Sequence, residues 1–263
     1  MQLELQDRVI LITGGAKGIG AACTKVFATE GATACILGRN PMEAAQLQDW
    51  AKENSFRVDS FACELTRPES IHDCVQSIKN RYGRIDCVVN NAGVNDGVGL
   101  RSSVEEFRQS LEKNLVHAFV VVQACLDSLI ATKGSIINIG SKCATTGQGG
   151  TSGYVAAKGG LNGLTREWAL DLVKYSIRVN CVIPAEVMTP MYENWIKSRP
   201  DPVAALKAIE QSIPLEQRMT TAEEIADMVV FLASPRSGHT TGQIIFVDGG
   251  YTHFDRALTT QGR

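Results

Sequence analysis

The stretch Val9-Ile10-Leu11-Ile12-Thr13-Gly14-Gly15-Ala16-Lys17-Gly18-Ile19-Gly20 contains the pattern that decides the fold. A short apolar run, typical of a strand covered on both faces, enters a glycine-rich turn, and a helical pattern follows over residues 21–29. Gly31 indicates the end of that helix, and a second apolar run occupies residues 32–37. Strand, turn, helix and strand in this order make a βαβ unit.

The same alternation continues along the chain. Further helices are expected over residues 41–53, 68–82, 103–131, 152–174 and 222–233, and further strands over residues 57–62, 85–89, 135–139, 177–183 and 243–247. No proline-rich linker or repeat interrupts the pattern. The sequence therefore predicts an α/β protein, a single-domain doubly wound Rossmann fold over residues 1–263 with a seven-stranded parallel sheet and helices on both faces. A small helical insertion at about 187–213 is expected to form a substrate loop.

Composition argues against several classes of function. The chain is 44% hydrophobic and 21% charged with a net charge of −2, so no basic excess indicates nucleic acid or an anionic membrane as a partner. The first residues lack the basic-then-apolar order of a signal peptide. The longest apolar stretch, residues 115–131, is interrupted by His117, Gln123 and Asp127, which favours a buried helix. We expect a soluble, cytoplasmic protein.

The cysteines and histidines give no sign of a metal site. None of the eight cysteines and four histidines stands at a zinc-type spacing. Cys35, Cys87 and Cys181 fall within apolar runs, where a free thiol behaves as a small hydrophobic group. No metal is expected.

The glycine turn is suited to a dinucleotide. Glycines let the backbone approach a pyrophosphate, and the following helix offers free N–H groups and the positive end of its dipole. The spacing Gly14-x-x-x-Gly18-x-Gly20 differs from Gly-x-Gly-x-x-Gly, so the turn is weak evidence when it stands alone. Its position at the first helix of a seven-strand chain is what favours a dinucleotide.

The end of the second strand bears on the choice of dinucleotide. The segment Leu37-Gly38-Arg39-Asn40 has no acid to hold a ribose 2′-hydroxyl, whereas Arg39 can pair with a 2′-phosphate. Lys17 adds a second cation on the same side, although both charges could simply be solvated. NADP is favoured over NAD, and NAD stays open.

Tyr154 and Lys158 stand four residues apart in a predicted helix, which places them on one face. A cation beside a phenol favours the phenolate and makes it a proton acceptor nearer neutral pH. Such a pair also occurs by chance as a surface aromatic and a lysine. Ser141 directly follows the strand over residues 135–139, at the end of the sheet where the cofactor crevice is expected. Asn114 lies in a long helix, where its amide can bond the backbone and admit a water.

Together these residues resemble the short-chain dehydrogenase/reductase family. The matching motifs, which follow the family's order over nearly the whole chain, are Thr13-Gly14-x-x-x-Gly18-Ile19-Gly20, Asn90-Asn91-Ala92-Gly93, Asn114, Ser141, Tyr154-x-x-x-Lys158, Arg178-Val179-Asn180 and Asp248-Gly249-Gly250. The resemblance implies that Tyr154 is the general acid/base and that Lys158 lowers its pKa and holds the nicotinamide ribose. It also implies that Ser141 bonds the reacting oxygen and that Asn114 positions a water.

The resemblance further implies a set of cofactor contacts. They are Gly14, Lys17, Gly18, Ile19, Gly20, Arg39, Glu64, Leu65, Asn91, Ala92, Gly93, Tyr154, Lys158, Pro184, Val187 and Thr189. Thr189 would contact the nicotinamide carboxamide. Glu64 would contact the adenine from a position where the family usually has aspartate.

The chain departs from the family on the substrate side. Where Pro-Gly is common it has Pro184-Ala185-Glu186, which would place the carboxylate of Glu186 near the substrate. Gln148 lies in the loop before Tyr154, and Asn95 and Asp96 follow the Asn-Asn-Ala-Gly turn. Each could be a solvated loop residue, but together they suit a polyhydroxylated substrate. The predicted substrate contacts are Asn95, Ser141, Gln148, Tyr154 and Glu186.

Four stretches resemble bacterial L-fucose dehydrogenases and related sugar dehydrogenases. They are Asn90-Asn91-Ala92-Gly93-Val94-Asn95-Asp96-Gly97, Gly147-Gln148-Gly149-x-Thr151-Ser152-Gly153-Tyr154, Pro184-Ala185-Glu186-Val187-Met188-Thr189-Pro190 and Tyr251-Thr252-His253-x-Asp255-Arg256-Ala257-Leu258. This resemblance implies oxidation of the C1 hydroxyl of an aldose such as L-fucose to a lactone with NAD(P). The alternatives are an NADPH-dependent carbonyl or 3-oxoacyl-(acyl-carrier-protein) reductase and a non-catalytic nucleotide-sensing or scaffold protein that kept the fold.

The sequence also suggests an assembly. Small residues on the Tyr154 helix, namely Ala156, Ala157, Gly159, Gly160 and Gly163, permit another helix to approach closely. The helix over residues 115–126 is apolar on more than one face. Because family members usually pair these helices between subunits, we expect a homotetramer in which the tail after Tyr251 contacts a neighbour.

Overall fold

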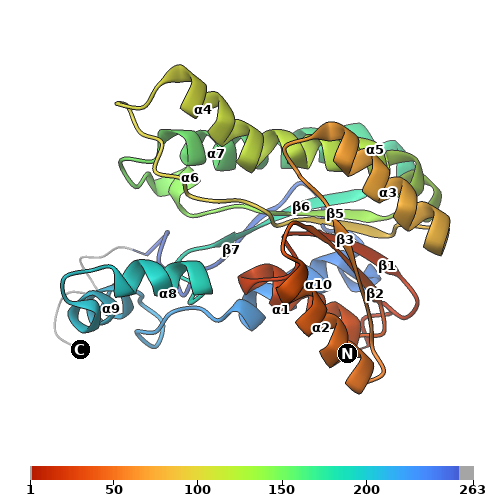
Figure 1. The fold of residues 1–263 in the computed structure, drawn as a ribbon, viewed down its shortest axis with the longest axis horizontal. Helices are drawn as coiled ribbons and strands as arrows, with labels where there is room; N and C mark the ends of the chain where they lie inside the picture. The colour runs from red at the N-terminus through yellow and green to blue at the C-terminus, as the bar shows by residue number, and fades with distance from the viewer. Residues whose placement is uncertain (1, 255–263) are drawn as a thin grey trace.

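A seven-stranded parallel sheet lies between two layers of helices (Figure 1). The computed structural model describes residues 2–254. The strands are β1 (Val9–Thr13), β2 (Thr33–Gly38), β3 (Arg57–Ala62), β4 (Cys87–Asn90), β5 (Ser135–Ile139), β6 (Arg178–Pro184) and β7 (Ile244–Val247), in the spatial order β3-β2-β1-β4-β5-β6-β7. This confirms the predicted doubly wound Rossmann fold, and each strand lies within two residues of its predicted bounds.

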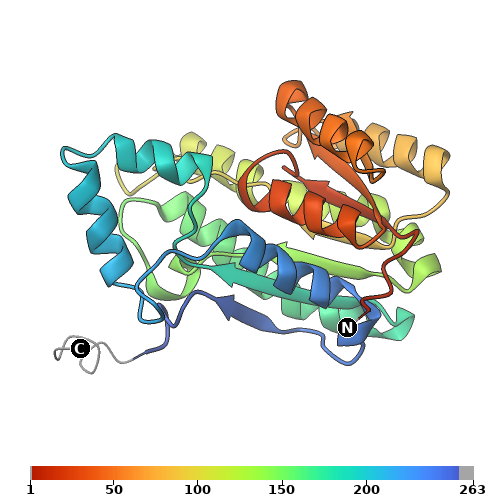
Figure 2. The same ribbon diagram turned by 90° about the horizontal axis from the view of Figure 1, so that it is seen from below.

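The helices divide evenly between the two faces. One face carries α3 (Pro68–Tyr82), α5 (His117–Thr132) and α7 (Ser152–Leu172), and the other carries α1 (Gly18–Thr29), α2 (Pro41–Glu53) and α10 (Ala222–Ala233) (Figures 1 and 2). Successive strand residues point to opposite faces, so Leu11 packs in the first core while Ile10 and Ile12 pack in the second. Burial on both sides explains why the strands read as continuous apolar runs.

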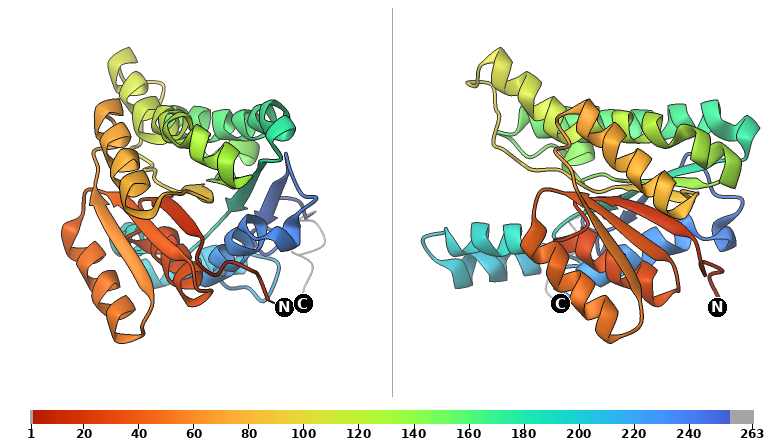
Figure 3. Two further views of the ribbon diagram at one scale, coloured as in Figure 1. Left: turned by 90° about the vertical axis from the view of Figure 1, so that its right-hand side faces the viewer. Right: turned by 45° about the vertical axis from the view of Figure 1, so that its right-hand side comes forward.

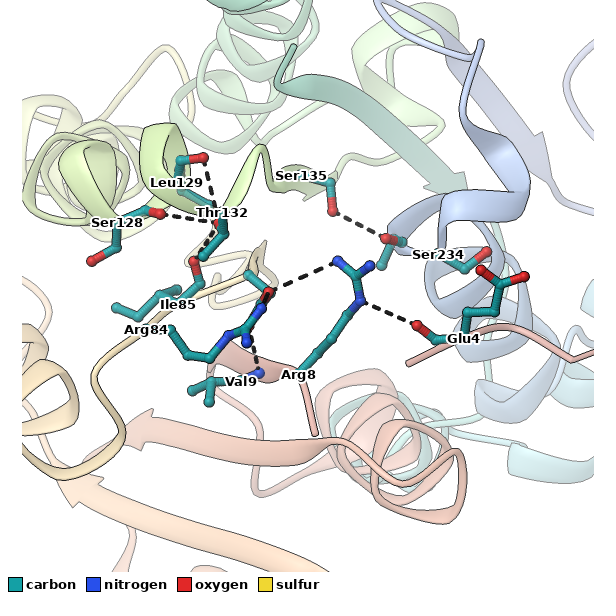
Figure 4. Close-up of polar contacts among 12 residues, drawn as sticks. Glu4, Arg8, Val9, Arg84, Ile85, Ser128, Leu129, Thr132, Ser135 and Ser234 are labelled. Atoms are coloured by element: carbon teal, nitrogen blue, oxygen red, sulfur yellow. Dashed lines mark hydrogen bonds and ion pairs between the residues drawn. The ribbon is translucent and has the colours of Figure 1, made fainter. Parts of the chain in front are cut away.

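A buried carboxylate fixes β1 against β4 at their amino ends. Asp86 Oδ2 accepts the Val9 N–H at 2.9 Å, and both carboxylate oxygens accept hydrogen bonds from the guanidinium of Arg84. Arg8 approaches the same carboxylate at 3.8 Å, and Figure 4 shows Arg8 and Arg84 beside Val9. These contacts lie at the end of the sheet away from the glycine turn.

The long helix predicted over residues 103–131 is interrupted. The structure has α4 (Val104–Leu111), a π-helical turn at Glu112–Val116, and then α5. The cause is Asn114, whose Nδ2 donates to Ser110 O at 2.9 Å while its Oδ1 accepts the Val94 N–H at 2.7 Å. Side-chain bonding to the backbone competes with the regular helical ladder, and π turns of this kind often occur at functional sites.

Counted through the π turn, the helical run Val104–Thr132 is apolar and long enough to cross a membrane by length and composition alone. Its α5 part packs against the sheet and α3, and 44% of its most apolar window is buried inside the fold. We interpret it as a core helix with one uncovered face.

The predicted insertion forms two capped helices, α8 (Pro190–Lys197) and α9 (Pro202–Gln211), that project beyond the end of β6 (Figures 1 and 3). Each begins with a proline after a cap, because Thr189 Oγ1 accepts from Tyr192 N and Asp201 Oδ1 accepts from Ala204 N. A short helix, α6 (Cys143–Thr146), was not predicted. Residues 255–258 of the tail motif lie outside the described residues.

Candidate active site

The carboxyl ends of β1 and β4 meet at the point where the strand order reverses, which is where Rossmann sheets bind their ligands. Thr13 Oγ1 accepts the backbone N–H groups of Asn91 and Ala92, both at 3.0 Å. Asn91 Nδ2 donates to Thr13 O at 2.9 Å and to Gly14 O at 3.2 Å. These bonds join the glycine turn to the Asn-Asn-Ala-Gly turn.

The glycine turn fits a pyrophosphate. Gly14 and Gly18 have φ values of +64° and +51°, which favour glycine, and a Cβ at Gly20 would lie 2.3 Å from Gly14 O. Lys17 precedes α1 without a side-chain cap, so the first N–H groups of the helix can face an anion. A Cβ at Gly18 would approach Thr189 Cγ2 at 3.1 Å, so Thr189 lies beside the glycine turn.

The structure brings Tyr154, Lys158 and Asn114 together. Lys158 is 2% exposed, and its Nζ donates to Ile139 O at 2.7 Å and lies 5.6 Å from the centroid of the Tyr154 ring. A Cβ at Gly93 would lie 3.1 Å from Asn114 Oδ1 and 3.3 Å from Lys158 Nζ. A side chain at position 93 would therefore press on both the amide and the ammonium, and glycine leaves them their space.

Ser141 completes the group and has a neighbour that sequence reasoning missed. Its Oγ lies 3.1 Å from the Sγ of Cys143, and its hydroxyl is close enough to Tyr154 to lower the pKa of the phenol. Cys143 is buried in α6. The sequence did contain a signal for Cys143, because it stands only two residues after Ser141.

Burial dominates the protonation of the pair. Desolvation, assisted by the nearby Cys143 thiol, raises the pKa of Tyr154 to about 12 against the lowering effect of Ser141. Burial also lowers the pKa of Lys158 to about 8. The prediction was that Lys158 lowers the pKa of Tyr154; in this structure the effect that lowers it comes from Ser141, and burial outweighs that effect.

Both cations expected at the cofactor's 2′ position are paired with carboxylates. Lys17 forms an ion pair with Glu43, in the first turn of α2, and Arg39 Nη1 lies 3.3 Å from Glu64 Oε2. Glu64 Oε1 accepts from the N–H and hydroxyl of Thr66, so this carboxylate is held at the start of the next segment. Glu43 was missed, although an acid a few residues after Arg39 was a visible signal.

The other predicted cofactor residues surround the same end of the sheet. Pro184 ends β6 and its carbonyl accepts the Lys142 N–H at 3.1 Å, while Val187 is buried and bridges to Thr220. Leu65 packs against the core on the α3 side.

Glu186, predicted to contact the substrate, is held by a group of side chains beyond the carboxyl end of β6. Its carboxylate pairs with the ammonium of Lys142 and accepts the Tyr192 hydroxyl at 2.5 Å. The Lys142 ammonium also lies 3.9 Å from the centroid of the Tyr251 ring. Lys142, which sequence reasoning missed, directly follows Ser141. These residues join segments after β5, β6 and β7 with α8.

The remaining predicted substrate residues differ in their surroundings. Gln148 is exposed in the loop between α6 and α7, and Asn95 is half-buried, with its Oδ1 accepting the Gly97 N–H at 3.3 Å. The carboxylate of Asp96 is bound to the helical segment that follows it, because the Ser110 hydroxyl donates to it at 2.8 Å and the Lys113 ammonium lies 3.7 Å from it.

No metal site is found in the part of the chain that the structure describes. Residues 2–254 contain no group of three or more His, Cys, Asp or Glu side chains able to hold a metal ion. All eight cysteines are buried free thiols, as expected for Cys35, Cys87 and Cys181.

A Rossmann sheet, a glycine turn shaped for a pyrophosphate and a Tyr/Lys/Ser/Asn group beside it define a class, the nicotinamide-dependent oxidoreductases. Comparison with known proteins agrees. A family model described as enoyl-(acyl carrier protein) reductase matches residues 14–252. The chain is 36% identical to a 3-oxoacyl-[acyl-carrier-protein] reductase of Thermotoga maritima, covering 94% of this chain and 99% of the relative. It is 34% identical to the L-fucose dehydrogenase of Bos taurus, covering 95% and 91%.

Solved structures show the same likeness. The dehydrogenase Cj0485 superposes with a TM-score of 0.93 at 42% identity, covering 98% of this chain and 99% of that one. L-sorbose reductase from Gluconobacter frateurii, solved with NADPH and L-sorbose, superposes with a TM-score of 0.91 at 27% identity, covering 97% and 100%. The chain belongs to the short-chain dehydrogenase/reductase family, whose members are NAD(P)-dependent oxidoreductases acting on CH–OH or carbonyl groups.

Replacement of the buried lysine is expected to separate stability from activity. Because the folded pKa of Lys158 is lowered from 10.5 to about 8, the native state disfavours the ammonium, at about 1.4 kcal/mol per unit. Below pH 8 this cost is present in full, and it is relieved as the pH rises toward 10.5. Lys158→Met should therefore be at least as stable as the wild type in urea at pH 7, and its relative advantage should shrink by pH 9.5. Its turnover should fall at least about 100-fold.

The control is Lys52→Met, which removes an exposed ammonium and should leave stability and its pH dependence unchanged. An advantage of Lys158→Met that grows between pH 7 and pH 9.5 would contradict the prediction.

A second pair of variants tests the buried ion pair at the substrate end. Lys142→Met leaves the Glu186 carboxylate buried without its cation and should lower the free energy of unfolding by about 2 kcal/mol. Adding Glu186→Leu removes the stranded charge, so the double variant should recover most of that stability in urea denaturation. A double variant less stable than Lys142→Met would show that the pair is not the cause.

Proposed function

We propose that this protein is a sugar dehydrogenase that oxidises the C1 hydroxyl of an aldose such as L-fucose to a lactone with NAD(P). The observation that carries the proposal is the polar group of Lys142, Glu186 and Tyr192 at the substrate end of the hydride-transfer site, with Gln148 exposed nearby. An acyl chain bound there would meet polar groups that it cannot pair, whereas sugar hydroxyls can donate and accept. Similarity to an L-fucose dehydrogenase and to L-sorbose reductase supports it.

The residues have separate roles in the proposed reaction. In its phenolate form Tyr154 accepts the proton of the C1 hydroxyl at Oη, and the Ser141 hydroxyl donates to the same oxygen as the C1–O bond becomes a carbonyl. Lys158 keeps a positive charge beside Tyr154, and Asn114 holds the π turn that opens the helix to a water. The bound nicotinamide supplies the chemistry of accepting the hydride from C1. The sugar thus loses one hydride and one proton.

For the cofactor we propose NADP as the favoured dinucleotide, with NAD as the second. Arg39 and Lys17 lie where a 2′-phosphate could replace their carboxylate partners, and both side chains are more than half exposed. Exposed ion pairs are worth little, so a bound phosphate can open them.

The second candidate is an NADPH-dependent reductase of carbonyl or 3-oxoacyl groups. The 36% identity to a 3-oxoacyl-[acyl-carrier-protein] reductase favours it, and it needs the same catalytic set. The two functions differ in substrate, so substrate preference decides between them.

Initial rates with L-fucose, D-arabinose and L-galactose, each with NADP and NAD, are expected to show sugar-dependent formation of NAD(P)H. A 3-oxoacyl thioester with NADPH serves as the comparison. Tyr154→Phe should lower kcat on the order of 10³-fold because the proton acceptor is lost, while the Kd for the cofactor stays within about twofold. Absence of reaction with every sugar, or full activity in Tyr154→Phe, would overturn the assignment.

We further propose that the protein is a cytoplasmic homotetramer without nucleic-acid or membrane partners. Apolar side chains are exposed on α5 and at the end of α7, among them Phe119, Leu170 and Val173. On α7 a Cβ at Gly159 or Gly163 would meet nothing within 4 Å, so another helix could approach there. Figure 3 shows the two helices on one face of the molecule.

Light scattering at micromolar concentration should give the mass of four chains. Phe119→Glu places a charge on the exposed face of α5 and should lower that mass, since a desolvated charge opposes helix pairing. Val203→Glu, on the exposed face of α9, is the matched control. A monomer mass for the wild type would refute the tetramer.

A further inference from the structure

Glu43 lies beside Lys17, one of the two cations expected at the cofactor's 2′ position. It lies in the first turn of α2, and its Oε1 forms the ion pair with Lys17 of the glycine turn. α2 begins directly after Arg39 and Asn40, at the carboxyl end of β2. The side chain of Glu43 is 26% exposed, whereas that of Lys17 is 55% exposed. A carboxylate therefore stands beside the cation that would meet a 2′-phosphate.

One oxygen of Glu43 has acceptor capacity left. Its Oε2 is buried and accepts no hydrogen bond from any residue that the structure describes. A buried acceptor without a partner lowers stability, so a movement of the side chain that brings this oxygen to a ligand donor would be favourable. The other acid at this end, Glu64, already accepts from Thr66 and pairs with Arg39. Glu43 is therefore the carboxylate better placed to take a donor from a ligand.

The two cofactors offer different groups to that carboxylate. NAD has a 2′-hydroxyl, a neutral donor that a carboxylate can accept. NADP has a 2′-phosphate, which carries a charge of about −1.5 to −2 near neutral pH and has no donor in its fully ionised form. A phosphate approaching Lys17 must either displace Glu43 or lie beside its negative charge. Selectivity is a difference between two affinities, and a repulsive group contributes to it as much as an attractive one.

We propose that Glu43 is a cofactor-selectivity residue that accepts the 2′-hydroxyl of NAD and weakens NADP binding by neutralising Lys17. The inference rests on the proposed dinucleotide role of the glycine turn, and it is independent of the sugar. Lys17 and Arg39 raise the affinity for NADP, and Glu43 limits that gain. The Lys17 side of the pair is half-exposed, so opening the ion pair costs little and NADP is weakened without being excluded.

The experiment measures binding of the oxidised cofactors to the full chain by calorimetry, without sugar. Glu43→Gln removes the charge and keeps the size of the side chain. It should lower the Kd for NADP about tenfold or more and raise the Kd for NAD a few-fold, which shifts the ratio of the two constants toward NADP. Adding Lys17→Met to Glu43→Gln should abolish most of the NADP gain, because the freed ammonium is its cause.

The matched control is Glu53→Gln, which removes an exposed carboxylate at the other end of α2 and should leave both Kd values within twofold. Glu43→Asp keeps the charge on a shorter stem, and it should keep a ratio nearer to the wild type than Glu43→Gln does. Thermal melts of each variant establish that it is folded. If Glu43→Gln does not fold, Glu43→Asp replaces it as the test. The shorter carboxylate should then contact Lys17 more weakly, so Glu43→Asp should bind NADP more tightly than the wild type does.

Two results overturn the proposal. A ratio of the two Kd values that is unchanged within twofold in folded Glu43→Gln, or an equal loss of affinity for both cofactors, shows that Glu43 is only structural. If the wild-type chain binds neither cofactor, the dinucleotide role fails and the selectivity role fails with it.

Discussion

The hydroxyl of Thr13 is the contact on which the site depends. It lies at the end of β1, next to the strand at which the sheet reverses its order, and it accepts two consecutive N–H groups from the turn after β4. The glycine turn and the Asn-Asn-Ala-Gly turn are thereby held at one spacing. Gly93 follows in the second turn and leaves room for Lys158 and Asn114. The same pair of hydrogen bonds therefore fixes the glycine turn relative to the turn whose Gly93 lies against Lys158 and Asn114.

Two other features of the site, the buried Lys158 and the π turn at Asn114, lower the stability of the fold. Lys158 is fully enclosed, its ammonium has lost its hydration, and a backbone carbonyl supplies the bond that the structure shows. At Asn114 the regular α-helical hydrogen bonding is lost, and the side chain bonds both Ser110 O and Val94 N. Both features are unfavourable in isolation and lie within reach of Tyr154. Strained and desolvated groups gather at active sites in this way because the surrounding fold can hold them there.

Patterns local in the sequence predicted the fold and the order of the site well. Apolar runs gave the strands, and the spacing of Tyr154 and Lys158 placed them together because one helix carries both. The π turn was not foreseen, since it arises from a contact between Asn114 and Val94 across two segments. The charge pairs were missed for the same reason. Lys17 with Glu43, and Lys142 with Glu186, join residues on different elements, and no local period encodes such a contact.

The two missed pairs differ in burial, and this difference implies different behaviour at the two ends of the site. The side chains of Lys142 and Glu186 are 13% and 10% exposed, and a third residue, Tyr192, bonds the carboxylate. Breaking such a pair strands a buried charge, so the wall of the substrate end is fixed before a ligand arrives. Lys17 and Glu43 are 55% and 26% exposed, so water can take the place of either partner at little cost. A rigid end can discriminate among substrates by the geometry of its donors and acceptors. An end that opens more easily can admit two cofactors that differ by one phosphate, and in our proposal the charge of its carboxylate sets the ratio between them.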